Sequence, residues 1–268
     1  MLFTSEGHSL PEDAMIVITM VGLGEAGRLI GEGLAEAGAR VKGYDPFVAL
    51  SDSPIVQYAE PAEALAETEI VISLVGPDAA EKVATQVLAL MPASAVYADL
   101  NTLSPGEKKA LGVLASDAGV PFADVAVMAP VPREGSRTPL LAAGSGAETF
   151  TAALSPLGTP VRAVSEEAGD AAARKMLRSV FMKGLAALII ESLDAASAVG
   201  ADGDLRDQIA AEFGENGAAL VDRLVDGTRQ HAGRRVHEME AAQAYLEELG
   251  VDHPVTDATV AHLRRLST

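Results

Sequence analysis

Short apolar runs alternate with helix-length segments through the first part of this chain. The runs that indicate strands are rich in Val and Ile: "MIVITMVG", "ARVKGYD", "EIVISLVG", "AVYADL", "VPFADVAVMA" and "LLAAGS". Strands separated by helices are typical of βαβ units, and continuously apolar strands indicate a parallel sheet that is covered on both faces. The pattern therefore predicts a doubly wound, parallel α/β domain over residues 15–164.

Beyond residue 165 the apolar positions take a helical spacing. Residues 169–200 predict a single helix of about 30 residues, which is unusually long for a globular protein. Further helices are predicted over residues 204–213, 217–230, 233–249 and 256–266. We therefore expect an all-α domain over residues 165–268. The N-terminal residues lack the basic start and apolar core of a signal peptide, and we expect residues 1–14 to form a flexible tail.

The composition excludes several classes of function. The net charge is −18, with 38 acidic against 20 basic residues, which argues against nucleic acid and anionic membranes as partners. The chain has no cysteine and its five histidines are scattered, so neither a disulfide nor a metal site is expected. No apolar stretch is long enough to span a membrane. We expect a cytoplasmic protein whose partner is a small molecule.

A glycine-rich turn follows the first predicted strand. In "VGLGEAG", Gly22, Gly24 and Gly27 form the pattern G-x-G-x-x-G at the start of a predicted helix. The first glycine allows a tight turn, the second lets the backbone approach a pyrophosphate, and the third lets the helix pack closely on the strand. The helix N-terminus adds free N–H groups and the positive end of a dipole. Between a strand and a helix, this pattern indicates dinucleotide binding.

The second predicted strand ends at Asp45, 18 residues after Gly27. A carboxylate at this position can accept hydrogen bonds from both ribose hydroxyl groups of NAD, and it would repel the 2′-phosphate of NADP. NAD is therefore the expected cofactor. NADP stays open because two cationic residues, Lys42 and Arg28, are close to the same turn in the sequence.

Lys175 stands near the start of the long predicted helix, in the segment "AGDAAARKMLRS". Ser179 shares its helix face at position i+4, and Lys183, at i+8, lies about 80° further round the helix. A lysine in this place is either a surface residue whose stem covers apolar groups or a proton donor in a pocket. The helical pattern alone leaves both interpretations open.

Four motifs, in order along the chain, resemble those of the β-hydroxyacid dehydrogenase family, which includes 6-phosphogluconate and 3-hydroxyisobutyrate dehydrogenases. The motifs are "VGLGEAGRLIGEGLAEAG", "DLNTLSP" (99–105), "DVAVMAP" (124–130) and "GDAAARKMLRS" (169–179). The resemblance implies a Rossmann-type NAD(P)-binding domain followed by a helical domain for substrate binding and dimerisation. It also implies that Lys175 is the catalytic general acid and base.

The resemblance assigns further residues to the cofactor and to the substrate. The implied cofactor contacts are Gly22, Leu23, Gly24, Glu25, Ala26, Gly27, Asp45, Val75 and Thr102. The implied substrate contacts are Asn101, Thr102, Met128, Ala129, Ser179, Lys183 and His237. The chain departs from the usual residues of the family at three places: Asn101 replaces Ser, "MAP" replaces Ser-Gly-Gly, and Ser179 replaces Asn. These departures indicate a divergent branch with a different substrate.

The expected function is that of an NAD(P)-dependent oxidoreductase that interconverts a small 3-hydroxy acid and its keto form and acts as a homodimer. Two alternatives stay open. Imine reductases have a similar two-domain plan, but they generally lack a lysine at the position of Lys175. The departures on the substrate side also leave room for a catalytically silent protein that only binds the nucleotide.

Overall fold

The computed structural model describes residues 15–267, which form two compact units. The first unit ends at Ala173 and the second begins at Arg174. The flexible tail expected over residues 1–14 lies outside the described residues. The predicted domain boundary falls between residues 164 and 165, and the folded chain keeps the next residues, up to Ala173, in the first unit.

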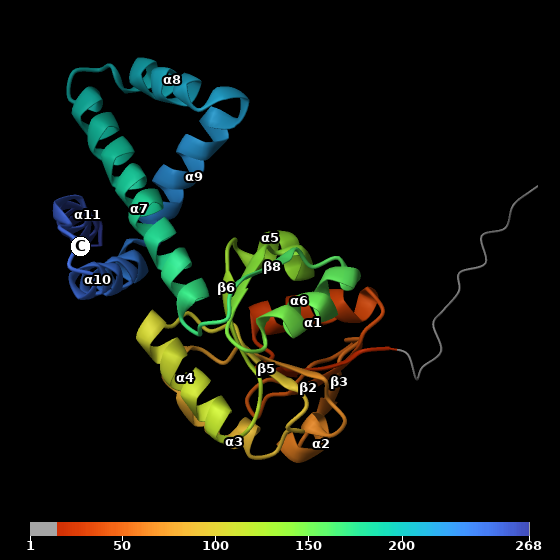
Figure 1. Ribbon diagram of the computed structural model, residues 1–268. Coiled ribbons are helices and arrows are strands. Elements are labelled where there is room, and N and C mark those ends of the chain that lie inside the picture. The colour runs from red at the N-terminus through yellow and green to blue at the C-terminus, as the bar shows by residue number, and fades with distance from the viewer. Residues whose placement is uncertain (1–14, 268) are drawn as a thin grey trace, which may run out of the picture. The chain divides into compact units, whose positions relative to one another are not determined.

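An eight-stranded sheet forms the centre of the first unit (Figure 1). Its strands are β1 (Val17–Val21), β2 (Arg40–Tyr44), β3 (Val56–Tyr58), β4 (Ile70–Ser73), β5 (Val96–Asp99), β6 (Phe122–Val127), β7 (Leu140–Ala143) and β8 (Val161–Ser165). Their order across the sheet is β3-β2-β1-β4-β5-β6-β7-β8. This order confirms the doubly wound α/β fold that the alternating pattern predicts.

The two strands at one edge of the sheet, β7 and β8, are antiparallel to the other six. β7 is antiparallel to β6, and β8 is parallel to β7, so the expectation of an entirely parallel sheet is wrong at this edge. A parallel neighbour requires a crossover connection, which is usually a helix lying across the sheet. The segment between β6 and β7 contains only α5 (Val131–Glu134) and a 3-10 turn, η2 (Gly135–Arg137). Because α5 is too short to cross the sheet, the chain reverses instead.

Helices cover both faces of this sheet (Figure 1). Besides α5 they are α1 (Glu25–Glu36), α2 (Pro61–Leu65), α3 (Pro77–Leu88), α4 (Pro105–Asp117) and α6 (Ala147–Leu154). α1, α5 and α6 form one core with the strands, which includes Ile30 and Phe150. α2, α3 and α4 form the core of the opposite face, which includes Val87 and Leu111. The apolar strands are thus buried on both sides, as their composition predicts.

The direction of strand addition changes beside β1. The chain adds β2 and β3 on one side of β1 and then places β4 on the other. In sheets of this kind, ligands bind at the carboxyl ends of the strands where this change occurs. The loops that leave β1 and β4 begin at Gly22 and Leu74, so both lie at the edge where a ligand is expected.

The second unit is entirely helical over its described residues. α7 (Asp170–Ser197) begins in the last residues of the first unit and continues into the second. The remaining helices are α8 (Asp202–Glu212), α9 (Gly217–Gln230), α10 (Ala232–Glu248) and α11 (Pro254–Leu266). α7 shares one core with α8 and α9, around Ile190, and another with α10 and α11, around Met239. The long predicted helix and the four shorter ones are confirmed.

Within residues 15–267, no helix is long and apolar enough to cross a membrane.

Candidate functional site

The glycine turn after β1 has no room for a side chain at two of its three glycines. Gly22 adopts a φ of 95°, and a Cβ atom there would lie 2.3 Å from the carbonyl oxygen of Leu74. A Cβ atom at Gly27 would lie 2.1 Å from the carbonyl oxygen of Gly22. Gly24 differs, because a Cβ atom there would meet no other atom within 4 Å. The turn is therefore packed closely on its inner side and open at Gly24.

The first turn of α1 presents backbone N–H groups at this opening. Gly24 is the N-cap residue of α1, and no side chain of the described residues caps this helix. The N–H groups of Glu25, Ala26 and Gly27 have no partner inside the helix, because an α-helix leaves the first N–H groups unpaired. The side chain of Glu25 is exposed. The open backbone and the unpaired N–H groups fit the pyrophosphate of a dinucleotide.

Asp45, at the end of β2, holds the glycine turn in shape. Its Oδ2 atom accepts a hydrogen bond from the backbone N–H of Leu23 at 2.8 Å. Its Oδ1 atom accepts two more, from the N–H groups of Phe47 at 2.8 Å and Val48 at 3.1 Å. The structure thus brings Asp45 and the glycine turn together, as the sequence predicts for a cofactor site.

The two cations near this turn have partners inside the protein. Lys42 is 3% exposed, donates a hydrogen bond to the carbonyl oxygen of Ala66 at 2.5 Å, and lies over the ring of Tyr58. Burial, with a smaller contribution from the charge of Arg40, lowers the pKa of Lys42. Arg28 forms an ion pair with the next turn of its own helix, at 2.8 Å from the carboxylate of Glu32.

Asn101 ties together the loops that follow β4 and β5. Its Oδ1 atom accepts hydrogen bonds from the N–H groups of Val75 at 2.9 Å and Gly76 at 2.8 Å. Its Nδ2 atom donates to Asp99 at 2.7 Å, and the residue is only 4% exposed. Thr102, the next residue, is exposed. Of the residues predicted in this region, Asn101 and Val75 are therefore in direct contact.

A buried charged cluster lies beside these loops, and sequence reasoning gave it no role. Ser73, Asp99 and Asp124 are register partners on β4, β5 and β6, and all three are fully buried. The Nζ atom of Lys108, from α4, lies 2.7 Å from Oδ1 of Asp99 and 3.4 Å from Oδ1 of Asp124. Lys108 shares the buried face of α4 with Leu111, and this helical spacing is the signal that could have identified it.

The third motif continues from β6 into the reversal of the chain. Met128 and Ala129 are both partly buried and follow directly after β6. The N–H group of Met128 donates to the carbonyl oxygen of Pro139 at 2.9 Å. The structure places these two predicted substrate contacts beyond the carboxyl end of β6.

In the second unit, the structure joins two of the four predicted residues. The Nζ atom of Lys183 lies 2.9 Å from Oγ of Ser179 and 2.9 Å from a carboxylate oxygen of Glu238 on α10. The side chain of His237 is 84% exposed and lies beside Glu240 on its own helix, at 3.4 Å. Lys175 is partly buried on α7, one turn before Ser179. Lys183, an expected substrate contact, thus belongs to a polar cluster with Ser179 and Glu238.

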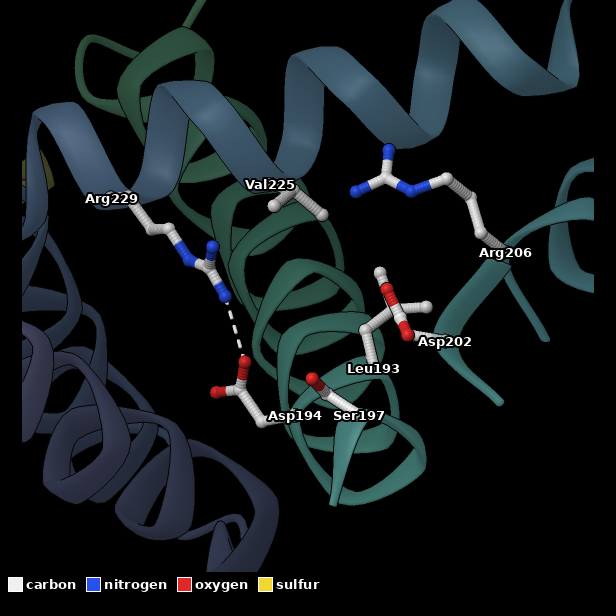
Figure 2. A pocket seen from close by; sticks show the side chains of 7 residues that line it. All are labelled: Leu193, Asp194, Ser197, Asp202, Arg206, Val225 and Arg229. Carbon is white, nitrogen blue, oxygen red and sulfur yellow. Dashed lines mark hydrogen bonds and ion pairs between the residues drawn. The ribbon is translucent and has the colours of Figure 1, made fainter. Parts of the chain in front are cut away.

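A small cavity of about 140 Å³ lies among α7, α8 and α9 (Figure 2). Its lining residues are Leu193, Asp194, Ser197, Asp202, Arg206, Val225 and Arg229. Arg229 pairs with Asp194 at 2.7 Å, and Arg206 pairs with Asp222. Both cations are already neutralised, and no predicted site residue lines this cavity. It is therefore not the candidate site.

Two family models match the chain. The NAD binding domain of 6-phosphogluconate dehydrogenase matches residues 17–157, and a domain of unknown function (DUF1932) matches residues 196–266. The first match covers more than half of the 268 residues and includes the glycine turn, Asp45 and Asn101. The second match covers most of the helical unit.

Solved structures of the same fold come from enzymes and from a protein without an assigned activity. A conserved hypothetical protein from Sinorhizobium meliloti is 30% identical, with a TM-score of 0.77 over 93% of this chain and 88% of the other. The 3-hydroxyisobutyrate dehydrogenase of Mycobacterium tuberculosis, solved with L-serine, is 19% identical, with a TM-score of 0.79 over 94% of each chain. A reductive aminase from Aspergillus terreus, in complex with NADPH, cyclohexanone and allyl amine, is 18% identical, with a TM-score of 0.62 over 94% of this chain and 93% of the other.

The likeness to the two enzymes shows the fold alone, whereas the family match rests on the sequence of the nucleotide-binding half. That half carries the closely packed glycine turn and the aspartate at the end of β2. This chain therefore belongs to the family defined by the NAD binding domain of 6-phosphogluconate dehydrogenase, and its fold is that of the NAD(P)-dependent hydroxyacid dehydrogenases.

Proposed function

We propose that this protein is an NAD(P)-dependent oxidoreductase that interconverts a small 3-hydroxy acid and its keto form, with Lys175 as general acid and base. The observation that carries the proposal is the glycine turn, which is closely packed on its inner side, open at Gly24 and next to Asp45. The position of Lys175 on α7, in the motif shared with the hydroxyacid dehydrogenases, adds the group that the chemistry needs.

The cofactor site supports NAD as the preferred nucleotide. When bound, the nicotinamide would supply hydride transfer. The N–H groups at the start of α1 would hold the pyrophosphate, and Asp45 would hold the adenosine ribose. Asp45 already accepts three backbone hydrogen bonds, and a carboxylate has about four lone-pair sites, so a ribose hydroxyl can still donate to it. A 2′-phosphate would instead face this negative charge, and Lys42 and Arg28 both have partners elsewhere.

Lys175 would exchange the proton that accompanies the hydride. During oxidation, the neutral amine accepts the hydroxyl proton of the substrate as the hydride leaves the carbon, and during reduction the ammonium returns that proton. The positive charge also stabilises the alkoxide character of the transition state. The ammonium of Lys183 is paired with Glu238 and bonded to Ser179, which gives Lys183 a structural task within the second unit.

An imine reductase is the second candidate, and the similarity of the fold to a reductive aminase favours it. Reduction of a C=N bond also requires a hydride and a proton at the same edge of the nucleotide site. Imine reductases generally lack a lysine at the position of Lys175, so the presence of this residue favours the hydroxy acid reaction.

A substrate screen separates the candidates. The purified protein is mixed with NADH or NADPH and a panel of keto acids, ketones, or ketones with amines, and the loss of reduced nicotinamide absorbance is followed. The reverse direction uses hydroxy acids with the oxidised cofactors. Turnover of a hydroxy acid or keto acid pair that requires Lys175 supports the first proposal. Turnover only when ketone and amine are both present supports the second, and nucleotide binding without any turnover contradicts both.

We also infer that the protein acts as a homodimer through α7. Leu177, Phe181 and Leu188 are 43%, 66% and 62% exposed and follow one face of this helix. At about 100° per residue they lie 200–240° round the helix from Lys175, on the side opposite to the proposed proton donor. A row of large apolar side chains at the surface is typical of a protein–protein interface.

A further inference from the structure

Asp124 binds the start of α7 with one of its carboxylate oxygens. Its Oδ2 atom accepts hydrogen bonds from the backbone N–H groups of Gly169 at 3.0 Å, Ala171 at 3.1 Å and Ala172 at 3.1 Å. These N–H groups lie at the beginning of the helix, where no partner exists within the helix itself. The carboxylate also lies at the positive end of the helix dipole. A residue of β6 thus supplies the N-terminal cap of a helix that begins more than 40 residues later.

The second oxygen of Asp124, Oδ1, is buried without a hydrogen-bond partner among the described residues, and its contact is an ion pair with Lys108. The Nζ atom of Lys108 lies 3.4 Å from Oδ1 of Asp124, 2.7 Å from Oδ1 of Asp99 and 2.6 Å from the carbonyl oxygen of Asp99. The ammonium group therefore donates hydrogen bonds to two oxygen atoms of Asp99 and forms a longer ion pair with Asp124. Lys108 is 1% exposed and both aspartates are fully buried, so water does not compete for these contacts.

The turn that precedes α7 is packed against the start of α4. Gly169 has a φ of 95°, and a Cβ atom there would lie 2.6 Å from the carbonyl oxygen of Pro105. Lys108 lies one turn further along α4, so the same helix contacts the turn and places a positive charge beside the carboxylate that caps α7. The first turn of α7 therefore has a fixed position in the first unit.

We propose that Asp124 is a positioning residue, which fixes the first turn of α7 and through it the place of Lys175. Lys175 follows Ala171 by four residues, which is about one helical turn, on the same continuous helix. The inference rests on the proposed function, in which Lys175 exchanges the proton. Lys108 balances the charge of the two buried aspartates and donates its hydrogen bonds to Asp99, so the hydrogen bonds of Asp124 to α7 do not depend on it.

Hydrogen exchange on the full chain without nucleotide tests the contact in the unaltered protein. The N–H groups of Ala171 and Ala172 should exchange at least tenfold more slowly than those of Glu25 and Ala26, after correction for their intrinsic rates. The first turn of α1 is the matched reference, because no described side chain caps it. Equal exchange in the two first turns would overturn the proposal.

Two double variants then separate positioning from stability. A single substitution would leave an unbalanced buried charge, whereas Lys108→Met/Asp99→Asn and Lys108→Met/Asp124→Asn each remove one cation and one carboxylate. In Lys108→Met/Asp99→Asn the carboxylate of Asp124 remains to cap α7. Hydrogen exchange at residues 169–173 and kcat should therefore stay within about threefold of the original protein. The second replaces three charge-assisted hydrogen bonds with weaker ones, so exchange there should rise and kcat should fall, each by tenfold or more.

The cofactor Kd separates positioning from a general structural role of Asp124. A general loss of structure would weaken cofactor binding as well, whereas a change in the position of Lys175 alone would not. Because Asp124 makes none of the contacts of the glycine turn, NADH binding should change by less than about threefold in Lys108→Met/Asp124→Asn. Equal exchange and equal kcat in the two double variants would overturn the proposal while leaving the function of Lys175 intact. If exchange differs as expected but Lys175→Met keeps full turnover, the proposed function fails and the contact of Asp124 with α7 stands.

Discussion

At the scale of single residues, Asp45 has two tasks that a substitution would disturb together. Its carboxylate accepts a hydrogen bond from the N–H group of Leu23 within the glycine turn, and we expect it to bind the ribose of NAD. Asp45→Ala should weaken NADH binding by about tenfold or more, because a hydrogen bond to a charged group contributes roughly 1.5–3 kcal/mol. The same change should relieve the repulsion of NADPH. Fluorescence titration of both reduced cofactors measures the two effects.

The control for this prediction is the unaltered protein, which should bind NADH more tightly than NADPH. A preference for NADPH in the original protein would show that the assignment of Asp45 to the ribose is incorrect. A fall in melting temperature without any change in either Kd would leave Asp45 with its task in the glycine turn alone.

Lys175 is the residue on which the proposed chemistry depends. Lys175→Met should lower kcat by at least about 10²-fold, since proton transfer by a positioned side chain contributes roughly 10²–10⁴-fold. The cofactor Kd should change by less than about tenfold, because the glycine turn and Asp45 remain. Steady-state kinetics on the substrate found in the screen, together with NADH titration, separates the two quantities.

Lys183→Met is the matched control on the same helix. Lys183 pairs with Glu238 and Ser179, so its loss should affect stability more than turnover. An inactive Lys183 variant beside an active Lys175 variant would mean that the proton donor lies two turns further along α7. Full activity of both variants would favour the imine reductase.

The residues of the candidate site differ in how far the sequence reveals them. The glycine turn and Asp45 were predicted from spacing, because a tight turn and a bound pyrophosphate restrict backbone geometry directly. Lys108 was not predicted, since a lysine in a polar segment such as "SPGEKKALG" is usually exposed. Its burial depends on Asp99 and Asp124, on the strands before and after α4, and such a cluster forms only when these strands lie side by side in the sheet.

At the scale of elements, α11 begins with a pH-sensitive contact. His253 precedes its first residue, Pro254, and its Nδ1 atom lies 2.7 Å from the carboxylate of Asp257. This hydrogen bond, with the charges of Asp257 and Glu247, raises the pKa of His253 above its ordinary value of 6.5. A raised pKa in the folded state means that protonation stabilises the fold. The stability that protonated His253 contributes is complete at pH values below the pKa of this residue in the unfolded chain. It is lost as the pH rises through the pKa of the residue in the folded protein.

His253→Asn should therefore lower the melting temperature more at about pH 5.5 than at about pH 8.5. Thermal unfolding curves at the two pH values measure this difference. Asp257→Asn removes the partner and should abolish most of the pH dependence caused by His253. An equal loss of stability at both pH values would show that the imidazolium makes no net contribution.

The helices were predicted more accurately than the strands at the sheet edges. The bounds of α9 match the predicted range of residues 217–230, because its amphipathic pattern continues over four turns. β3 and β8 were missed since both are edge strands with partly exposed residues, so neither shows a continuous apolar run. The direction of β7 depends on the short connection before it, and periodicity carries no information about direction.

At the scale of the whole molecule, the exposed face of α7 predicts self-association. Residues 184–193 are almost continuously apolar, which is typical of a helix buried on all sides, and the structure buries Ile189 and Ile190 within the second unit while Leu188 stays exposed. Together with Leu177 and Phe181, Leu188 forms the surface that we expect a second copy to cover. The protein should therefore be a dimer at micromolar concentration by light scattering.

Phe181→Glu should shift this equilibrium towards the monomer, because a dimer would bury two unpaired carboxylates. Val113→Glu is the matched control, since Val113 is 61% exposed on α4 in the first unit and should leave the mass unchanged. A monomeric original protein would contradict the inference, and so would an unchanged dimer in the Phe181 variant.

The capping of α7 by Asp124 decides where this chain can be divided into separate modules. A truncation after Ser165, where the last strand ends, would remove all three N–H donors of Oδ2 and leave the buried carboxylate of Asp124 without them. A truncation after Ala173 keeps those donors in the same fragment. A nucleotide-binding module intended for a fusion protein or a biosensor should therefore include the first turn of α7, although most of that helix lies in the second unit.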